Sequence, residues 1–178
     1  MKRLLAKLAT GLLLMALVAP ALWSCNSETA SAKALREHTD LYKTIDDTLI
    51  RGYLNRNHIT NYTRTESGLY LINTADGTGP LISTGNQVAV RYIGRLLGYG
   101  RSGQIFENSN DNRTPCRCGN FTVGQQIAGW NEGLQLMQMG SRKTLLIPSY
   151  MAYSYGGSGN IGPDQPLLFE MEIVGVSR

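Results

Sequence analysis

Two different spacings of hydrophobic side chains divide the sequence. Between Ala32 and Ile59, apolar residues recur at steps of three and four among charged ones, which predicts an amphipathic helix. Its apolar stripe consists of Leu35, Tyr42, Ile45, Leu49, Ile50, Tyr53 and Leu54. Such a stripe has to be buried, so we expect the helix to pack either on the domain that follows or on a second copy of the chain.

After Ser67 the spacing changes to two, which is typical of half-buried strands. The change is clearest where Val88, Val90 and Tyr92 fall on one face of a single segment. Pro148 ends one of the strands, because proline cannot donate a hydrogen bond to a strand ladder. The predicted strands are 68–72, 86–97, 104–109, 121–123, 143–148 and 167–176.

One helix interrupts the strands. Its apolar residues follow one another at steps of three, four and three, and therefore share one helical face. These residues are Ile127, Trp130, Leu134 and Met137. We expect Gly140 to end the helix in the left-handed conformation. Since no further helices connect the strands, the sequence predicts an α+β fold with an antiparallel sheet packed on one short helix, preceded by an N-terminal helix.

The N-terminus has the features of a bacterial lipoprotein signal peptide. The basic residues Lys2, Arg3 and Lys7 precede an apolar run, 11–22, that is short for a membrane span. The run leads into LWSC, which resembles a lipobox with Cys25 as the acylated residue. A plain secretory signal with an incidental cysteine is the alternative.

These features predict the organisation and location of the protein. We expect a signal peptide at 1–24, lipid attachment, a tether and the amphipathic helix at 25–64, and the folded domain at 65–178. Acylated Cys25 would anchor the protein to a membrane of the cell envelope. By analogy with other lipoproteins, Asn26 after the cysteine favours the outer membrane, facing the periplasm or the exterior.

The charge of the chain depends on this N-terminal segment. The full chain has 17 Lys and Arg against 13 Asp and Glu, and the excess comes mostly from the basic residues before Cys25. Without them the charges nearly balance, and no basic stripe remains that would bind nucleic acid. The 20 glycines, most of them after Gly68, agree with a turn-rich sheet domain.

Cys116 and Cys118 are separated by one residue. In an extracytoplasmic compartment such a pair can form a disulfide, although at this spacing the bridge would be strained or would need a local turn. A redox-active pair and a free pair are the alternatives. The two histidines, His38 and His58, do not lie near these cysteines in the sequence, so we expect no metal site and no cofactor.

Four stretches follow one another in a specific order: VRYIGRLL, IFENS, IAGWNEGLQLMQMGSRKTLLIPSYMAY and LLFEMEIVGV. Over Ser67–Val176 they resemble the FKBP family of peptidyl-prolyl cis/trans isomerases. The resemblance implies a twisted antiparallel sheet wrapped around one short helix, with a hydrophobic pocket between them. With the signal peptide, it implies an isomerase for X–Pro bonds of unfolded or proline-containing polypeptides outside the cytoplasm.

The resemblance also implies which residues form the pocket. The expected catalytic residues are Tyr92, Phe106, Glu107, Ile127, Trp130, Tyr153 and Phe169. The expected substrate-binding residues are Gln126, Tyr155 and Ile161. Trp130 would form the floor on which the proline ring lies, while the Ile127 backbone N–H and the Tyr153 hydroxyl would hold carbonyl groups.

The sequence departs from the family pattern at several of these places. Glu107 replaces the usual aspartate, Gln126 a common valine, and Ser154 a usual glycine. A common pocket aromatic is absent near Cys118 and Gly119. A more open and more polar pocket could bind proline yet catalyse slowly. The alternative function is therefore a lipoprotein chaperone that binds proline-containing segments with little or no catalysis.

Overall fold

The computed structural model describes residues 28–98 and 100–177. The predicted signal peptide at 1–24 and the predicted lipidation site Cys25 lie outside these residues. The helices are α1 (Ala30–Arg56) and α2 (Ala128–Gln135). The strands are β1 (Thr63–Arg64), β2 (Tyr70–Ala75), β3 (Gln87–Leu96), β4 (Ile105–Asn108), β5 (Gly119–Thr122), β6 (Arg142–Ile147) and β7 (Leu167–Ser177). Three short 3₁₀ helices are η1 (Ser109–Asp111), η2 (Ser149–Met151) and η3 (Ser154–Gly156).

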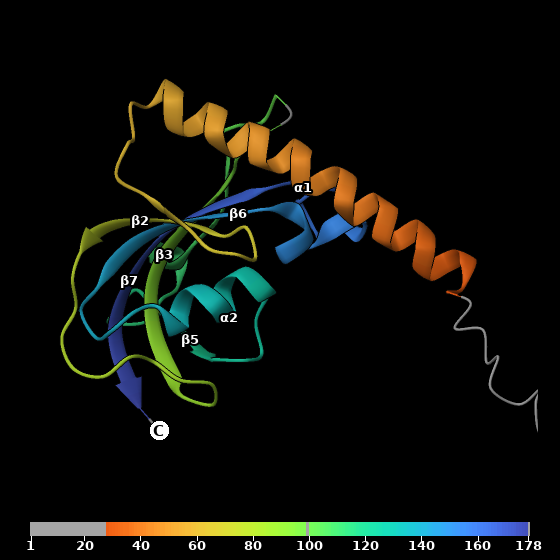
Figure 1. The fold of residues 1–178 in the computed structure, drawn as a ribbon. Coiled ribbons are helices and arrows are strands. Elements are labelled where there is room, and N and C mark those ends of the chain that lie inside the picture. Colours follow the sequence, from red (N-terminus) through yellow and green to blue (C-terminus); the bar gives the residue numbers. More distant parts are fainter. Residues whose placement is uncertain (1–27, 99, 178) are drawn as a thin grey trace, which may run out of the picture. The chain divides into compact units, whose positions relative to one another are not determined.

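The seven strands form one antiparallel sheet in the order β1-β2-β6-β7-β3-β4, and β5 pairs with β3. The long strand β3 pairs with β7 along its whole length. On its other side, the first half of β3 pairs with β5 and the second half with β4. The strands curve around α2 (Figure 1). The predicted α+β class with an antiparallel sheet and one short helix is confirmed.

Successive side chains of a strand point to opposite faces, so the sheet has one face buried under α2 and another that α1 covers only in part, where Arg91 and Glu170 are exposed. Leu145 and Ile147 of β6 belong to the cluster that contains the buried face of α2. Leu146 and Leu168 belong to a second cluster, which contains Ile50 and Leu54 of α1. The contacting part of α1 lies in the same compact unit as the sheet, which spans Arg36–Arg178.

The helix α1 buries its stripe on its own chain. Ile50 and Leu54 are 0% and 1% exposed, and each fully buried aliphatic side chain contributes about 1.5–3 kcal/mol. The helix ends three residues before the predicted Ile59. His58 adopts a φ of 55°, and the Ile59 N–H donates to Leu54 O while the His58 N–H donates to Asn55 O. This is a Schellman ending in which histidine occupies the left-handed position usually given to glycine.

The helix α2 is shorter than the sequence predicts, and the prediction for Gly140 was wrong. The helix ends at Gln135, where the N–H groups of Leu136 and Met137 donate to carbonyls three residues back. Gly140 does have a positive φ of 81°, but its N–H donates to Ile173 O in the turn that leads into β6. Apolar periodicity therefore continued past the last helical hydrogen bonds.

Two glycines within α2 allow the helix to lie close to β6. A Cβ atom on Gly129 would collide with the side chain of Ile147, and one on Gly133 with that of Leu145. Glycine in a helix interior costs roughly 0.5–1 kcal/mol relative to alanine. That cost is offset here by close packing, which fixes the position of Trp130 relative to the sheet.

Cys116 and Cys118 form a disulfide, with a Cα–Cα distance of 5.2 Å. The short spacing is possible because Arg117 lies in the left-handed region with a φ of 51°. The Arg117 N–H donates to Thr114 O and closes a turn. The sequence left the state of this pair open, and the local turn that a bridge requires is present.

Candidate active site

A cavity of about 150 Å³ opens between α2 and the sheet. This is roughly ten times the volume that one water molecule needs. Its lining residues come from four strands, the start of α2, the segment before it, and the loop after β6: Tyr92, Glu107, Phe121, Gln126, Ile127, Trp130, Tyr153 and Phe169. The structure thus brings together most of the residues that the sequence predicted for the pocket.

Aromatic rings form the floor and walls of this cavity. Trp130 is only 4% exposed, and its ring meets those of Tyr92, Phe121 and Phe169 edge to face at centroid distances of 5.1, 4.9 and 5.1 Å. Edge-to-face pairs of this kind contribute about 0.5–1.5 kcal/mol beyond the area they bury. The Trp130 indole is therefore held rigidly and presents an apolar surface.

The indole nitrogen of Trp130 is an exception to this apolar environment. Its Nε1–H group is buried and has no hydrogen-bond partner among the described residues. Unpaired buried donors are few in native proteins, and leaving one unmade costs about 1–3 kcal/mol.

Tyr92 and Glu107 form the polar side of the cavity. The Tyr92 hydroxyl donates to Glu107 Oε1 over 2.6 Å. Burial, and then this bond, raises the pKa of Tyr92 above its ordinary value, so the phenol stays protonated and remains a donor. The longer side chain of Glu107, compared with the family aspartate, does not prevent the contact.

Ile127 and Tyr153 supply the donors that a bound carbonyl group would need. Within the part of the chain that the structure describes, no hydrogen bond uses the Ile127 backbone N–H or the Tyr153 hydroxyl. Tyr153 is 37% exposed, and burial followed by the charge of Glu107 raises its pKa. The Tyr153 hydroxyl therefore keeps its proton at neutral pH, as the Ile127 backbone N–H does, and both groups can donate.

Asn131 positions the segment that presents Ile127, and the sequence analysis missed it. Its Oδ1 accepts from the N–H groups of Gly124 and Gln126 at 2.8 and 3.1 Å, and its Nδ2 donates to Gln126 O at 2.6 Å. A side chain on α2 thus replaces a conventional helix cap, because Ile127 itself has no capping side chain.

Phe121 is a wall of the cavity that the sequence analysis also missed. The family position for a pocket aromatic falls at Cys118 and Gly119, and Phe121 lies further along β5. Its ring closes on Tyr92 at a centroid distance of 5.6 Å. The alternation of Phe121 and Val123 on one strand face was the signal that could have found it.

Three predicted site residues lie outside the lining of the cavity. Phe106 packs behind it, edge to face on Phe169 at 5.5 Å, and Gly94 permits this because a Cβ there would lie 2.7 Å from the Phe106 ring. Ile161 is buried in the core cluster. Tyr155 is exposed, and its ring meets the edge of His38 at 5.9 Å.

The loop that carries Tyr153 shows why glycine is usual after it. Ser154 has a φ of 49°, a conformation that costs a non-glycine residue roughly 1–2 kcal/mol. The Ser154 carbonyl accepts from the Asp164 N–H at 2.8 Å. The loop therefore keeps the conformation despite the serine.

The described residues contain no group of His, Cys, Asp and Glu arranged to hold a metal ion. Among them, no helix is both long enough and apolar enough to cross a membrane.

The sequence matches the family model of FKBP-type peptidyl-prolyl cis-trans isomerases over residues 79–174, more than half of the chain. It is 38% identical over 111 residues to a probable FKBP-type peptidyl-prolyl cis-trans isomerase, FkpA, of Neisseria meningitidis serogroup B. The alignment covers 62% of this chain but 38% of that relative, so the chain spans well under half of the relative's length.

Two solved structures have the same fold. A peptidyl-prolyl cis-trans isomerase from Pseudomonas syringae pv. tomato superposes with a TM-score of 0.64 and 30% identity, covering 79% of this chain and 96% of that one. FkpA from Escherichia coli superposes with a TM-score of 0.64 and 26% identity, covering 83% of this chain and 65% of that one.

Proposed function

This chain belongs to the FKBP-type peptidyl-prolyl cis-trans isomerase family, and from that membership we propose that it accelerates rotation about X–Pro bonds in proline-containing polypeptides. One observation carries the proposal. The cavity has the Trp130 indole as its floor and is also lined by Ile127 and Tyr153, whose N–H and hydroxyl can donate. A proline ring that lies on the indole brings its imide between these groups.

The chemistry requires no nucleophile. The barrier to rotation, about 18–20 kcal/mol, comes from amide resonance, which places negative charge on the oxygen. Water stabilises that charge-separated planar form, and an aromatic cavity removes the water. The twisted amide is less polar and therefore loses less hydration free energy when it enters the cavity. Glu107, the carboxylate in the lining, is engaged by Tyr92 and is not offered as a base.

Positioning of the substrate in the cavity contributes the remainder of the rate acceleration. The Ile127 N–H and the Tyr153 hydroxyl would hold the carbonyls on either side of the rotating bond while the ring stays on Trp130. A 10⁴-fold acceleration requires about 5.5 kcal/mol, and two hydrogen bonds of about 1 kcal/mol each plus desolvation are of that order. Because the cis and trans states differ by only about 0.5–1 kcal/mol, speed is what such a protein provides.

The test is proline-limited refolding of a substrate protein with and without the purified protein. The Tyr153→Phe variant should reduce kcat/KM about tenfold, since it removes one donor worth about 1.4 kcal/mol. Refolding at the same rate in buffer and in the presence of the intact protein would exclude the function.

A second candidate is a module that binds proline-containing segments with little catalysis. Gln126 in the lining and the left-handed Ser154 favour it, since both depart from the family pattern at the site. It predicts that Tyr153→Phe leaves suppression of client aggregation unchanged. Loss of refolding catalysis and of aggregation suppression in the same variant would count against it.

The cellular setting is part of this proposal. We propose a lipoprotein held by acylated Cys25 in the cell envelope, on the outer membrane, acting on proteins outside the cytoplasm. The signal-like N-terminus supports it, as does the Cys116–Cys118 disulfide, because disulfides persist in oxidising compartments. One acyl chain binds membranes only marginally, so multiple acylation is expected. Cys25→Ser should shift the protein from the membrane to the soluble fraction, and an unchanged distribution would refute the anchor.

A homodimer through α1 would have to use the face of the helix that is not docked. Ile50 and Leu54 are buried on the chain's own sheet, whereas Leu41 is 57% exposed. Sedimentation at high concentration tests the dimer directly, and a monomer would exclude it.

A further inference from the structure

The helix α1 makes a buried polar contact with the loop that carries Tyr153. Asp46 lies within the apolar stripe of α1 and is 0% exposed. Its Oδ2 accepts from both the backbone N–H and the hydroxyl of Ser149, each at 2.7 Å. Ser149 begins η2 two residues after the end of β6 and four residues before Tyr153. A buried carboxylate is costly, so this pairing fixes the start of the loop strongly.

A second contact joins α1 to the far end of the same loop. His38 Nε2 lies 3.1 Å from Asp164 Oδ2. The Asp164 N–H in turn donates to the carbonyl of Ser154, the residue after Tyr153. The segment between Ser149 and Asp164 is therefore held by α1 at both ends, with Tyr153 between them.

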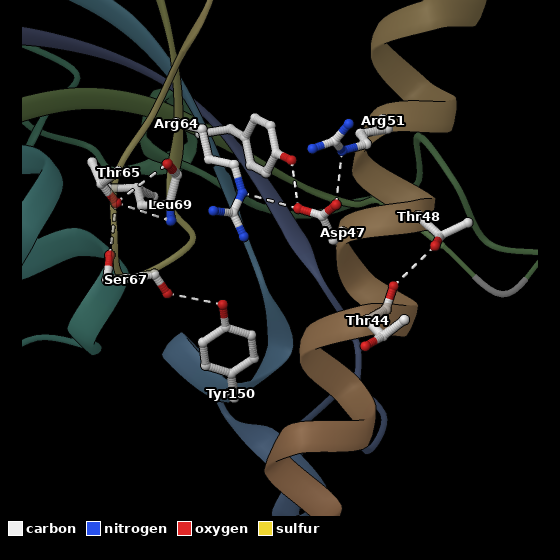
Figure 2. A network of polar contacts seen from close by, with 10 residues as sticks. Thr44, Asp47, Thr48, Arg51, Arg64, Thr65, Ser67, Leu69 and Tyr150 are labelled. Atoms are coloured by element: carbon white, nitrogen blue, oxygen red, sulfur yellow. Dashed lines mark hydrogen bonds and ion pairs between the residues drawn. The ribbon is translucent and has the colours of Figure 1, made fainter.

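A second polar network attaches α1 to the sheet, and it does not include Asp46. Figure 2 shows Asp47 between Arg51 and Arg64. Asp47 Oδ1 accepts from the Tyr70 hydroxyl at 2.6 Å and from Arg64 Nε at 2.9 Å. Two neighbouring aspartates thus have different tasks. Asp47 attaches the helix to β1 and β2, and Asp46 attaches it to the Tyr153 loop.

We propose that Asp46 is a positioning residue for the isomerase reaction: through Ser149, α1 holds the loop that places the Tyr153 hydroxyl at the cavity. The inference rests on the proposed function, since it assigns a residue outside the cavity to that reaction. It makes the N-terminal helix part of the catalytic unit, although none of its residues lines the cavity.

Kinetics of an X–Pro peptide test the role. Asp46→Ala should lower kcat about tenfold while KM changes less than threefold, because the aromatic floor around Trp130 is untouched. Asp46→Asn keeps an acceptor for Ser149 and should restore activity to within threefold of the wild type. Asp47→Asn is the matched control, since it weakens docking on Tyr70 and should leave kcat within threefold.

A double-mutant cycle separates positioning from a general structural effect. If Asp46 acts through Tyr153, then Asp46→Ala should cost nothing further in the Tyr153→Phe background. Equal losses in both backgrounds would overturn the inference. Ser149→Ala removes one of the two bonds to Asp46 and should give a smaller loss, which keeps the test open if Asp46→Ala fails to fold.

Hydrogen exchange on the same proteins provides a readout that does not depend on activity. Asp46→Ala should speed exchange of backbone amides between Ser149 and Gly157, while amides of α2 remain as protected as in the wild type. If Asp46→Ala is active and its amides exchange as slowly as those of the wild type, the role of Asp46 is overturned while the proposed function stands. A wild-type protein with no isomerase activity would instead remove the proposed function, and the positioning role of Asp46 with it.

Discussion

The two faces of one sheet are packed in different ways. The face toward α2 is covered by rings, with Trp130 surrounded by Tyr92, Phe121 and Phe169, and it encloses a cavity. The face toward α1 is covered by aliphatic side chains such as Leu146. A hollow of about 280 Å³ also borders α1, but Tyr53 is the single ring in its lining, which otherwise consists of polar and aliphatic side chains such as Arg56 and Leu97.

The two faces also differ in how their polar groups are bonded. On the α1 face, the Tyr70 hydroxyl and the Asp47 carboxylate are bonded to each other and to arginines. On the α2 face, the indole Nε1–H of Trp130 is without a partner among the described residues. Within the described part of the chain, buried polar atoms without a partner therefore occur on both sides, a donor at the cavity and the acceptor Asp46 Oδ1 under α1. Substitutions of apolar side chains on one face or the other should separate stability from activity.

The largest effect is expected from Trp130→Ala on the cavity face. Truncating this buried ring should cost 3–5 kcal/mol in the free energy of unfolding and at least 100-fold in kcat/KM, because the floor for the proline ring is lost. Denaturant unfolding and peptide isomerisation measure the two quantities.

Leu54→Ala on the other face is its matched control. It should cost 2–4 kcal/mol in unfolding free energy while leaving kcat/KM within threefold of the wild type, measured where the variant is folded. Similar activity losses in Leu54→Ala and Trp130→Ala would show that the faces are not separable.

A smaller effect is expected from Asn131→Leu, which removes the bonds to Gly124 and Gln126 at the edge of the cavity face. The segment before Ile127 should loosen, and kcat/KM should fall about tenfold, or about 1.4 kcal/mol. Peptide kinetics measure it. Gln135→Ala, which removes one bond to the Asn131 carbonyl and one from the Thr84 hydroxyl on the exposed side of α2, should have little effect. A full-rate Asn131→Leu protein would mean that the Ile127 N–H needs no such support.

The last effect, of similar size, concerns pH and the α1 face. Burial raises the pKa of Asp46 to about 6, against the lowering effect of the two bonds from Ser149, and the charge of Asp164 raises it further. The other titratable groups that interact with the charge of Asp46 are Tyr42 and Tyr150, while His38 contacts Asp164. Since the folded pKa exceeds the unfolded one, the contribution of Asp46 to stability is present at low pH and is lost as pH rises through about 6.

Unfolding experiments at pH 5 and pH 8 measure this contribution. The wild type should lose about 1.4 kcal/mol over this interval relative to Asp46→Asn, which corresponds to about one pKa unit. Asp47 does not interfere, because its pKa is lowered: burial raises it, but the bond from Tyr70 and the charge of Arg51 outweigh burial. A parallel pH dependence in wild type and Asp46→Asn would contradict the prediction.

The features of the fold that could be predicted from the sequence are those that depend on the spacing of apolar residues. The spacing of two along β3 and β7, and of three and four along α2, gave the fold class, the antiparallel sheet and the inward position of Trp130. The predicted helices were too long at their C-terminal ends, because apolar side chains keep the helical spacing beyond the last helical hydrogen bond. At α1 the helix end is marked by His58 in the left-handed position, where glycine would have been the recognisable sequence signal.

Residues that act through hydrogen bonds were less visible. Asn131 bonds to backbone groups five and seven residues earlier, a pattern without a sequence signature. Asp46 was visible in principle, since it lies four residues before Ile50 and eight before Leu54 on the buried stripe. A charged residue at such a position needs a partner, and Ser149, far away in sequence, could be identified only from the structure.

The measurement that tests the central claim most directly is the cis-to-trans rate of a short X–Pro peptide, followed together with tryptophan fluorescence. In a chain that begins at Cys25, Trp130 is the single tryptophan. The account predicts that the rate rises in proportion to protein concentration and saturates over the same peptide concentrations that change the Trp130 emission. An unaccelerated peptide, or full acceleration without any change at Trp130, would contradict it.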